Sequence, residues 1–580
     1  MRRPDGPRYT RRPQPKPKAS ELAPSGRPDA LRIIPIGGNE ETGGRNCYLI
    51  EYKKEYLIID IGLQFPEDDM TGVDYVIPDL SLLKGKERQV KGIIVTHGHY
   101  DHIGGVPYWS EQLNNPPIFA TDLTCAMLAK KAEDAAPGKK LRLNKVKGRD
   151  RFKIGNFRIQ VFALSHNIPG SLGVVVETPT GIIVHTGDFK LDTGAHVMNS
   201  TDYDFIKDLG KRNVLCLMCD STNSPVAGHQ MSEAEIEGNI DSMFTKTKGR
   251  IMFATFASNL SRFQQIITLA EKYNRHVLVE GFSLKTNVEI GKELGYVRCK
   301  PHTLITWEQA QKLPNNRYII LCTGAQGEDN AVLMRVANRE HKYLRVEKGD
   351  LIVFSSSVVP GNERSVEHLK DGLYREGAEI IDYKMLDIHA GGHANADDLV
   401  DMMRWVHPKY VIPIEGSFMH LVENKKNAIR AGIPEDHVLL ADNGQVVEFE
   451  NGKGYVTNHR FPIQYVFVDG LGIGDVNALV LRDRKQLAAD GMVIVVAQIN
   501  TRTGKVGKVD IISRGMTHMK EQGRLIRDMV GAVHASLKMR EPRVKPQEKD
   551  LREKVRRDLE KFIFQKTHRQ PMVLPVIIEA

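Results

Sequence analysis

The sequence has few cysteines, few tryptophans and no long apolar run. Its 580 residues include six Cys, scattered at positions 47, 125, 216, 219, 299 and 322, and three Trp. Scattered thiols favour a reduced cytoplasmic protein over one held together by disulfides. No apolar run reaches the roughly 18 residues of a transmembrane helix, and the basic N-terminus lacks the apolar segment of a secretory signal. We therefore expect a cytoplasmic protein with no membrane-spanning helix.

A Gly-x-Ser-x-Gly nucleophile elbow is also absent from the sequence. The strongest chemical signal is instead the segment Thr96 to His102, which reads THGHYDH. It follows the apolar run Gly92 to Val95, a predicted buried strand, so its imidazoles and carboxylate should emerge together at one rim of a sheet. Imidazole nitrogen and carboxylate oxygen suit Zn²⁺. The spacing HxHxDH is much more specific than a lone HxH, and it favours a metal site over a surface histidine cluster.

Two further ligand candidates follow predicted strands in the same way. His166 comes two residues after the end of the apolar segment 157–164, and Asp188 comes two residues after the end of the segment 181–186. A single His after a strand is usually structural. Here several ligand candidates follow strand ends, which is where open α/β sheets place their sites, and this favours a shared metal centre.

With these residues, the sequence resembles the metallo-β-lactamase fold family. The resemblance implies that one metal is held by three histidines, that a second is held by an Asp–His pair, and that one carboxylate bridges both. These ligands would be His97, His99 and His166, then Asp101 and His102, and finally Asp188 as the bridge. Such a pair of cations lies about 3.5–4 Å apart, and the water between them is deprotonated near neutral pH, so the implied nucleophile is hydroxide.

The segment after this set resembles the β-CASP nuclease branch, which processes RNA or DNA. It contains the motif Asp220-Ser221-Thr222, followed by four predicted strands at 251–255, 277–280, 319–322 and 351–354. Each strand ends in small or hydroxyl residues. Such residues are common in turns. Four such loops in series also favour a surface of backbone N–H groups that binds phosphate.

Motifs along most of the chain resemble the ribonuclease J family. They lie at 37–43, 97–105, 185–190, 323–328, 355–363, 389–394, 472–476 and 510–515. The resemblance implies catalytic roles for Asp188, for Asp220 in supporting the metal shell, and for His393 near the scissile phosphate. It also implies a pocket for a 5′-monophosphate, formed by Ser355, Ser356, Ser357, Gly361, His389, Gly391, Gly392 and His393.

Several positions depart from that family's pattern. A His that completes the second metal's shell in the family is replaced by Glu415, a harder ligand that shifts preference toward Mn²⁺ or Mg²⁺. Phe282 stands in place of an Arg, Ser261 in place of a His, and Tyr100 in place of a Glu. We expect two Zn²⁺ per subunit, with Glu415 as a metal ligand and a second site that is weaker or takes Mn²⁺ or Mg²⁺.

The expected fold is α/β: a metallo-β-lactamase αββα sandwich with an inserted β-CASP α/β domain and a small C-terminal α/β domain. A basic arm, disordered and rich in Pro, is predicted at 1–30, where eight Lys or Arg and three acidic residues give a local charge of +5 out of +9. It either raises RNA affinity through counterion release or is a solvated tail. The other predicted boundaries are 31–223 and 380–461 for the sandwich, 224–379 for the β-CASP domain, 462–469 for a linker and 470–580 for a C-terminal oligomerisation domain.

In the C-terminal domain the pattern predicts strands at 477–481 and 492–499 and helices at 516–539 and 548–566. The last helix has an apolar stripe, Val555, Leu559, Phe562 and Ile563, for its own sheet or for another subunit. The family resemblance implies a homodimer or homotetramer formed through this domain.

We expect a metal-dependent ribonuclease that degrades single-stranded, 5′-monophosphorylated RNA in the 5′-to-3′ direction, with endonuclease activity, in RNA maturation and decay. The alternative is a catalytically weakened RNA-binding paralogue that scaffolds an active nuclease subunit.

Overall fold

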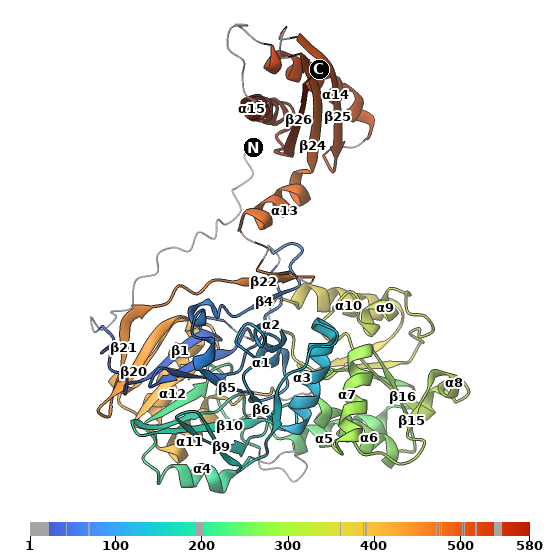
Figure 1. Cartoon of the computed structure of the whole chain (residues 1–580). Coiled ribbons are helices and arrows are strands. Elements are labelled where there is room, and N and C mark those ends of the chain that lie inside the picture. The colour runs from blue at the N-terminus through green and yellow to red at the C-terminus, as the bar shows by residue number, and fades with distance from the viewer. Residues whose placement is uncertain are drawn as a thin grey trace. The chain divides into compact units, whose positions relative to one another are not determined.

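The computed structural model describes residues 23–41, 43–67, 70–192, 201–359, 361–386, 388, 391–470, 472–474, 476, 478–500, 503, 505–516, 519–538 and 548–579. The chain forms two compact units (Figure 1). The first unit consists of the chain up to Gln64 together with Ile77–Tyr465. The second unit consists of Phe65–Val76 together with Val466–Ala580. Of the predicted N-terminal arm, residues 1–22 lie outside the described residues. Within the rest of the arm, Ser25 N donates to Glu448 Oε1 at 2.9 Å.

Two β-sheets packed face to face form the centre of the first unit. One sheet has the order β21 (Lys453–Arg460), β20 (Gln445–Glu450), β1 (Leu31–Gly37), β2 (Cys47–Tyr52), β3 (Glu55–Ile59), β5 (Val90–Ile94), β6 (Ile118–Ala120) and β7 (Leu143–Lys145). The other has the order β19 (Tyr410–Ile414), β12 (Cys216–Asp220), β11 (Gly181–His185), β10 (Leu172–Thr178), β9 (Phe157–Ala163) and β8 (Arg151–Ile154). Alternate apolar residues from both sheets share one core, which includes Ile50, Ile59, Val161 and Val174.

Helices cover the outer faces of the two sheets, so the expected αββα sandwich is confirmed. The second sheet is covered by α4 (Tyr203–Leu209), α11 (Ala396–Val406) and α12 (Phe418–Arg430), whose apolar sides join its core. On the side of the first sheet lie the short helices α1 (Tyr100–Ile103) and α2 (Val106–Trp109) and the longer α3 (Asp122–Ala135) (Figure 1).

A wholly parallel sheet forms the inserted lobe, between β12 and β19 in the sequence. Its order is β15 (Leu304–Ile305), β14 (His276–Glu280), β16 (Tyr318–Cys322), β13 (Ile251–Ala254), β17 (Leu351–Phe354) and β18 (Glu379–Asp382). The four strands predicted for this region are all present. Its helices are α5 (Glu233–Lys246), α6 (Leu260–Lys272), α7 (Phe282–Glu293), α8 (Trp307–Ala310), α9 (Val332–Ala337) and α10 (Glu363–Arg375).

The second unit contains a small sheet in the order β25 (Lys505–Arg514), β24 (Met492–Asn500) and β26 (Met572–Glu579). One face is covered by α14 (Met519–Leu537) and α15 (Glu548–Thr567). The α15 stripe faces this sheet, because Val555, Leu559 and Ile563 are buried in the shared core. A shorter sheet has the order β23 (Gly472–Ile473), β22 (Val466–Asp469) and β4 (Tyr75–Ile77), and so joins residues from two distant parts of the sequence.

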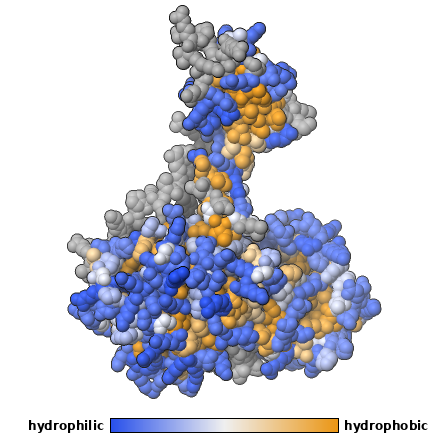
Figure 2. All heavy atoms as spheres, viewed as in Figure 1, coloured by the Kyte–Doolittle hydropathy of each residue, from blue (hydrophilic) through white to orange (hydrophobic). Residues whose placement is uncertain are grey.

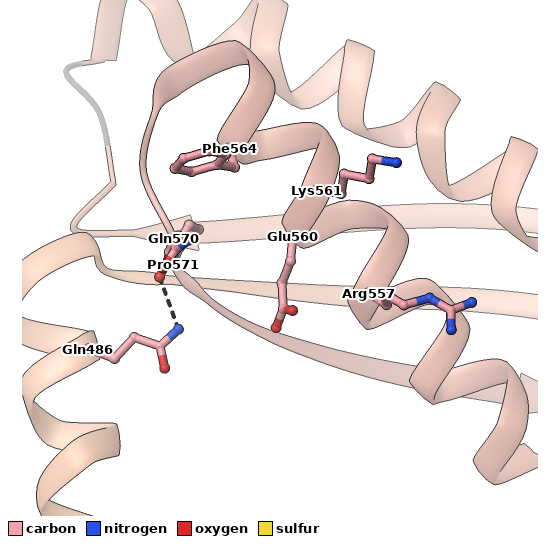
Figure 3. Close-up of a pocket in the computed structure, with 7 residues that line it drawn as sticks. All are labelled: Gln486, Arg557, Glu560, Lys561, Phe564, Gln570 and Pro571. Carbon is pink, nitrogen blue, oxygen red and sulfur yellow. Dashed lines mark hydrogen bonds between the residues drawn. The ribbon is translucent and has the colours of Figure 1, made fainter. Parts of the chain in front are cut away.

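The strand predicted at 477–481 is wrong. Residues from Ala478 onward form the helix α13 (Ala478–Asp490). The apolar run Ala478 to Leu481 is too short to distinguish a strand from a helix by periodicity alone, and the charged residues after it continue the helix. In Figure 3 Gln486 on this helix lies beside the segment that precedes β26, and its Nε2 donates to Gln570 O at 3.0 Å. None of the described helices is long and apolar enough to cross a membrane.

Candidate metal centre

The predicted ligands converge at one rim of the sandwich, where strands from both sheets end. The HGHYDH segment follows β5, His166 follows β9, Asp188 follows β11, and Glu415 follows β19. Strands β11, β12 and β19 are parallel neighbours, so their carboxyl ends reach the same edge. Residues about 320 positions apart in the sequence, such as His97 and Glu415, therefore lie around one site.

Three histidines and one carboxylate form the first ligand group. His99 Nδ1 lies 3.0 Å from His97 Nε2 and 3.1 Å from His166 Nε2. Asp188 Oδ2 lies 3.5 Å from His97 Nε2 and 3.6 Å from His166 Nε2. Ligands about 2.0–2.1 Å from a tetrahedral Zn²⁺ stand about 3.4 Å from one another. The four donor atoms therefore have the mutual spacing that one such cation requires.

The second group is built around His102 and shares Asp188. His102 Nε2 lies 3.3 Å from Asp188 Oδ1, 3.4 Å from Glu415 Oε1 and 3.8 Å from Asp101 Oδ2. Asp188 Oδ1 is buried and has no hydrogen-bond partner among the described residues. Burying an unpartnered carboxylate oxygen is costly, so its position fits a cation ligand. The two oxygens of Asp188 thus face different groups, Oδ2 the first and Oδ1 the second, as in a bridging carboxylate.

Glu415 is held in place by its backbone as well as by its neighbours. It adopts φ of +59°, a left-handed conformation that is strained for a residue other than Gly. Asn46 Nδ2 donates to Glu415 Oε1 at 2.7 Å and lies 3.1 Å from His102 Nε2. Tyr48 Oη accepts a hydrogen bond from the backbone N–H of Glu415 at 3.2 Å. These contacts aim the carboxylate at the second ligand group.

Asp60, which sequence reasoning missed, orients His102 from behind. Its Oδ2 lies 2.8 Å from His102 Nδ1 and accepts from Thr96 Oγ1 at 2.8 Å, while Oδ1 accepts from Thr96 N at 2.8 Å. A carboxylate on one ring nitrogen leaves the other nitrogen free to bind a metal. The signal was present in the sequence, because Asp60 also stands at the end of an apolar strand.

Burial keeps the three histidines of the first group neutral. It lowers the pKa of His99 to about 3, and it lowers the pKa of His97 and of His166 well below the usual value for histidine. Neighbouring imidazoles act in the same direction. Because a metal binds the neutral ring, these nitrogens do not have to lose a proton at neutral pH.

The second group has the opposite electrostatics. Burial disfavours the charged ring of His102, but the carboxylates of Asp188, Asp101 and Asp60 outweigh it and raise the His102 pKa well above its usual value. Burial also raises the pKa of Asp188, and the charge of Glu415 adds to that effect. Carboxylates packed this closely repel one another, and a divalent cation would offset that repulsion.

His393 lies beside the first group and is paired with Asp220. Its Nδ1 is 2.8 Å from Asp220 Oδ2, and its Nε2 is 3.8 Å from Asp188 Oδ2. Burial opposes the charged ring, but the carboxylates of Asp220 and Asp188 prevail and raise the His393 pKa to about 10. Gln230 and Asn223 donate to the His393 carbonyl at 3.0 and 3.3 Å, which fixes the loop. The pairing with Asp220 thus favours the protonated ring of His393, whose Nε2 faces Asp188.

The other predicted phosphate-binding residues are only partly brought together. Ser355 Oγ donates to the Ile388 carbonyl at 2.8 Å, close in the chain to Gly391 and Gly392. Gly392 has no room for a side chain, because a Cβ there would lie 2.3 Å from His166 Cε1, and its carbonyl lies 2.6 Å from His166 Nδ1. Gln326 Nε2 donates to Ser356 Oγ and to the Ser357 carbonyl. The N–H of Gly361 donates to Glu363. His389 lies outside the described residues.

Known proteins similar to this chain agree with this architecture. Residues 41–209 match the metallo-beta-lactamase superfamily, residues 248–373 match the beta-CASP domain of ribonuclease J, and residues 479–580 match the ribonuclease J C-terminal domain. The chain is 35% identical over 557 residues to Ribonuclease J 1 of Streptococcus pyogenes, covering 95% of this chain and 98% of that protein. The chain belongs to the ribonuclease J family. It is also 34% identical to Ribonuclease J2 of Bacillus subtilis, over 95% of this chain and 98% of the relative.

A solved structure with a similar fold is a protein of unknown function from Enterococcus faecalis. It has a TM-score of 0.51 and 14% identity, and it covers 74% of this chain and 100% of its own. That likeness concerns the fold alone. Membership of the ribonuclease J family confirms the resemblance inferred from the motifs, and together with the two ligand groups it supports a metal cofactor.

Proposed function

We propose that this ribonuclease J family member hydrolyses RNA phosphodiester bonds with the help of divalent cations. It would work 5′-to-3′ from a 5′-monophosphorylated end, with endonuclease activity as a second mode, in RNA maturation and decay. The observation that carries the proposal is the position of Asp188, which turns one oxygen to each ligand group and lies 3.8 Å from His393. The names of the relatives support RNA as the substrate.

Cations bound to the two groups would lower the pKa of a water molecule and neutralise charge on the phosphoryl oxygens. The protein's own residues then position the substrate and move the proton. Water adds to phosphorus and gives a proton to solvent, the bond from phosphorus to the 3′-oxygen breaks, and that oxygen takes a proton from His393 Nε2, which solvent then replaces. Asp220 holds the other ring nitrogen, so the proton of His393 points into the site. The remaining strand keeps a new 5′-phosphate and can be shortened again.

The preference for a 5′-monophosphate would come from the loops around Ser355 and Gly391 to His393. Small residues there leave backbone N–H groups accessible to a phosphate. Arg262 Nη1 donates to the same Ile388 carbonyl as Ser355 Oγ, at 3.1 Å, which anchors the start of this loop. We assign two Zn²⁺ per subunit, and the Glu415 carboxylate makes Mn²⁺ or Mg²⁺ a competitor at the second group.

The C-terminal unit would support a homodimer or homotetramer. The face of its sheet away from α14 and α15 exposes Ile512, Leu574, Val576 and Ile578 to between 42% and 47%. Figure 2 shows apolar residues gathered on the surface of this unit. Apolar side chains in such a row favour burial against another surface. Mass measurement in solution, with and without Val576→Asp, tests this assignment.

One assay separates the nuclease from a scaffold with a weakened site, the alternative that Glu415 in a ligand position favours. The purified chain is incubated with 5′-phosphorylated RNA and either Mn²⁺ or Zn²⁺, and the products are resolved by length. Release of nucleoside monophosphates supports the proposal. Persistent RNA binding with no cleavage, or cleavage that is lost when a co-purifying subunit is removed, supports the scaffold.

A further inference from the structure

Two aromatic side chains are exposed beside helix α3, which packs against the ligand loop. Phe282, the first residue of α7, is 77% exposed, and Tyr100, between the ligands His99 and Asp101, is 44% exposed. Isolated apolar residues at a surface are common, but large rings more often avoid water. Two exposed rings tied to the same helix need an explanation, and neither the ligand groups nor the His393–Asp220 pair involves them.

Helix α3 connects the two rings through consecutive lysines. Lys131 Nζ lies 4.9 Å from the centre of the Tyr100 ring, and Lys130 Nζ lies 5.9 Å from the centre of the Phe282 ring. Both separations are within the range of cation–π attraction. Lys130 also forms an ion pair with Asp134 at 2.9 Å. Each ring is therefore combined with a positive charge.

The helix that carries these lysines is anchored to both lobes. Helices α3 and α7 lie side by side (Figure 1). Tyr296, just beyond α7, donates to Asp122 Oδ1 at the start of α3 at 2.9 Å. Met127 packs against the ligand loop, since its sulfur would lie 2.7 Å from a Cβ added to Gly98. The rings and lysines are thus held in a fixed relation to the cation ligands.

We propose that Tyr100, Phe282, Lys130 and Lys131 form a platform on which bases of the single-stranded RNA substrate stack. Every base offers a π-face to an aromatic ring, and nearby lysines attract the phosphates between the bases. The lysines favour a polyanion over an apolar peptide as the occupant. The inference rests on the proposed function, and it names how the strand is gripped beside the site.

Removing one ring should weaken RNA binding by roughly 5- to 100-fold, the range for loss of a base–aromatic stack. Phe282 is the better position to test, because Tyr100 adjoins two ligands. With 77% of Phe282 exposed, its truncation leaves the core intact. Phe282→Tyr keeps a ring and should bind RNA as tightly as the natural protein does. Phe282→Leu keeps apolar bulk without a ring and should bind RNA more weakly. Tyr374→Ala removes a ring that is 53% exposed on α10, and it is the matched control.

The full chain is titrated, with EDTA present to prevent hydrolysis, against a short 5′-phosphorylated oligoadenylate and against the same strand with abasic sites. A 2-aminopurine base in the strand reports stacking by its fluorescence. The natural protein and Tyr374→Ala should prefer the base-bearing strand, and in Phe282→Ala that preference should fall by roughly 5- to 100-fold and the fluorescence change should be smaller. The platform is refuted if Phe282→Ala keeps the full base preference and fluorescence change. It is also refuted if this variant binds both strands with equally reduced affinity. Cleavage is assayed separately, so an inactive but base-selective natural protein would contradict the proposed function and not the platform.

Discussion

The substitution Asp60→Asn tests whether a residue outside both ligand groups controls the second cation. In the structure Asp60 Oδ1 accepts from Thr96 N and Oδ2 lies 2.8 Å from His102 Nδ1. The backbone N–H of Thr96 can only donate. An Asn at this position must therefore turn its carbonyl toward Thr96 and its NH₂ toward His102. The ring nitrogen that faces the NH₂ must accept, so the His102 proton moves to Nε2, the atom that would bind the cation.

The expected loss is about 10- to 100-fold in affinity at the second site, as for other outer-shell partners of metal ligands, or about 1.4–2.7 kcal/mol. The first site, which does not contain His102, should be unchanged. Calorimetric titration of the metal-free protein with Mn²⁺ and with Zn²⁺ resolves the two affinities. Asp79→Asn makes the same change at a buried carboxylate that holds Ser81 N at 3.0 Å, and it serves as the control. Equal weakening of both sites, or no weakening, would refute this reasoning.

Three further outcomes are expected. Asp188→Ala removes the oxygen shared by both groups, so RNA cleavage should become undetectable and the metal content of the purified chain should fall; retained cleavage would contradict the bridging role. Glu415→His replaces a hard ligand with imidazole and should shift activity toward Zn²⁺ over Mn²⁺, whereas an unchanged metal preference would show that Glu415 is not a ligand. Glu233 is buried, and although burial opposes its charge, Arg262 and Lys190 lower its pKa from 4.5 to about 2. Its folded-state pKa is depressed, so its stabilising contribution is complete above about pH 4.5 and is lost as pH falls toward 2. Glu233→Gln should lower the unfolding free energy by about 3 kcal/mol at pH 7, and in urea unfolding this gap should narrow below pH 4.5; a gap independent of pH would contradict the assignment.

That the candidate cation ligands come together could be predicted from the sequence, because most of them follow the end of an apolar strand. His97, His166 and Asp188 follow β5, β9 and β11, and parallel strands bring such ends to one rim. The two residues that support the second group, Asp60 and Asn46, were not predicted. They act by hydrogen bonding to candidate ligands. Asp60 does follow an apolar strand, as the ligand candidates do, but its partner His102 is set by contacts between separate segments.

Chain organisation was predictable where periodicity was strong and not where it was weak. Four of the six strands of the inserted sheet were expected, as were the helices α14 and α15. The segment Phe65–Val76 belongs to the same compact unit as the C-terminal part, and no sequence pattern indicated this. Its short apolar stretches carry no period, and its place is decided by packing of residues such as Val73 and Val76 with Phe467.

The inserted lobe leaves the sandwich after β12 and the chain returns to β19, the adjacent parallel strand, with Asp220 opposite Ile414. A segment of any size can therefore be grafted between these neighbours without breaking the hydrogen-bond ladder that joins them. The candidate ligands that follow β5, β9 and β11 belong to the sandwich, while the insert brings its own loops toward the same rim. Exchange of this one module would therefore change the loops at the rim while the candidate ligands that follow β5, β9 and β11 keep their places.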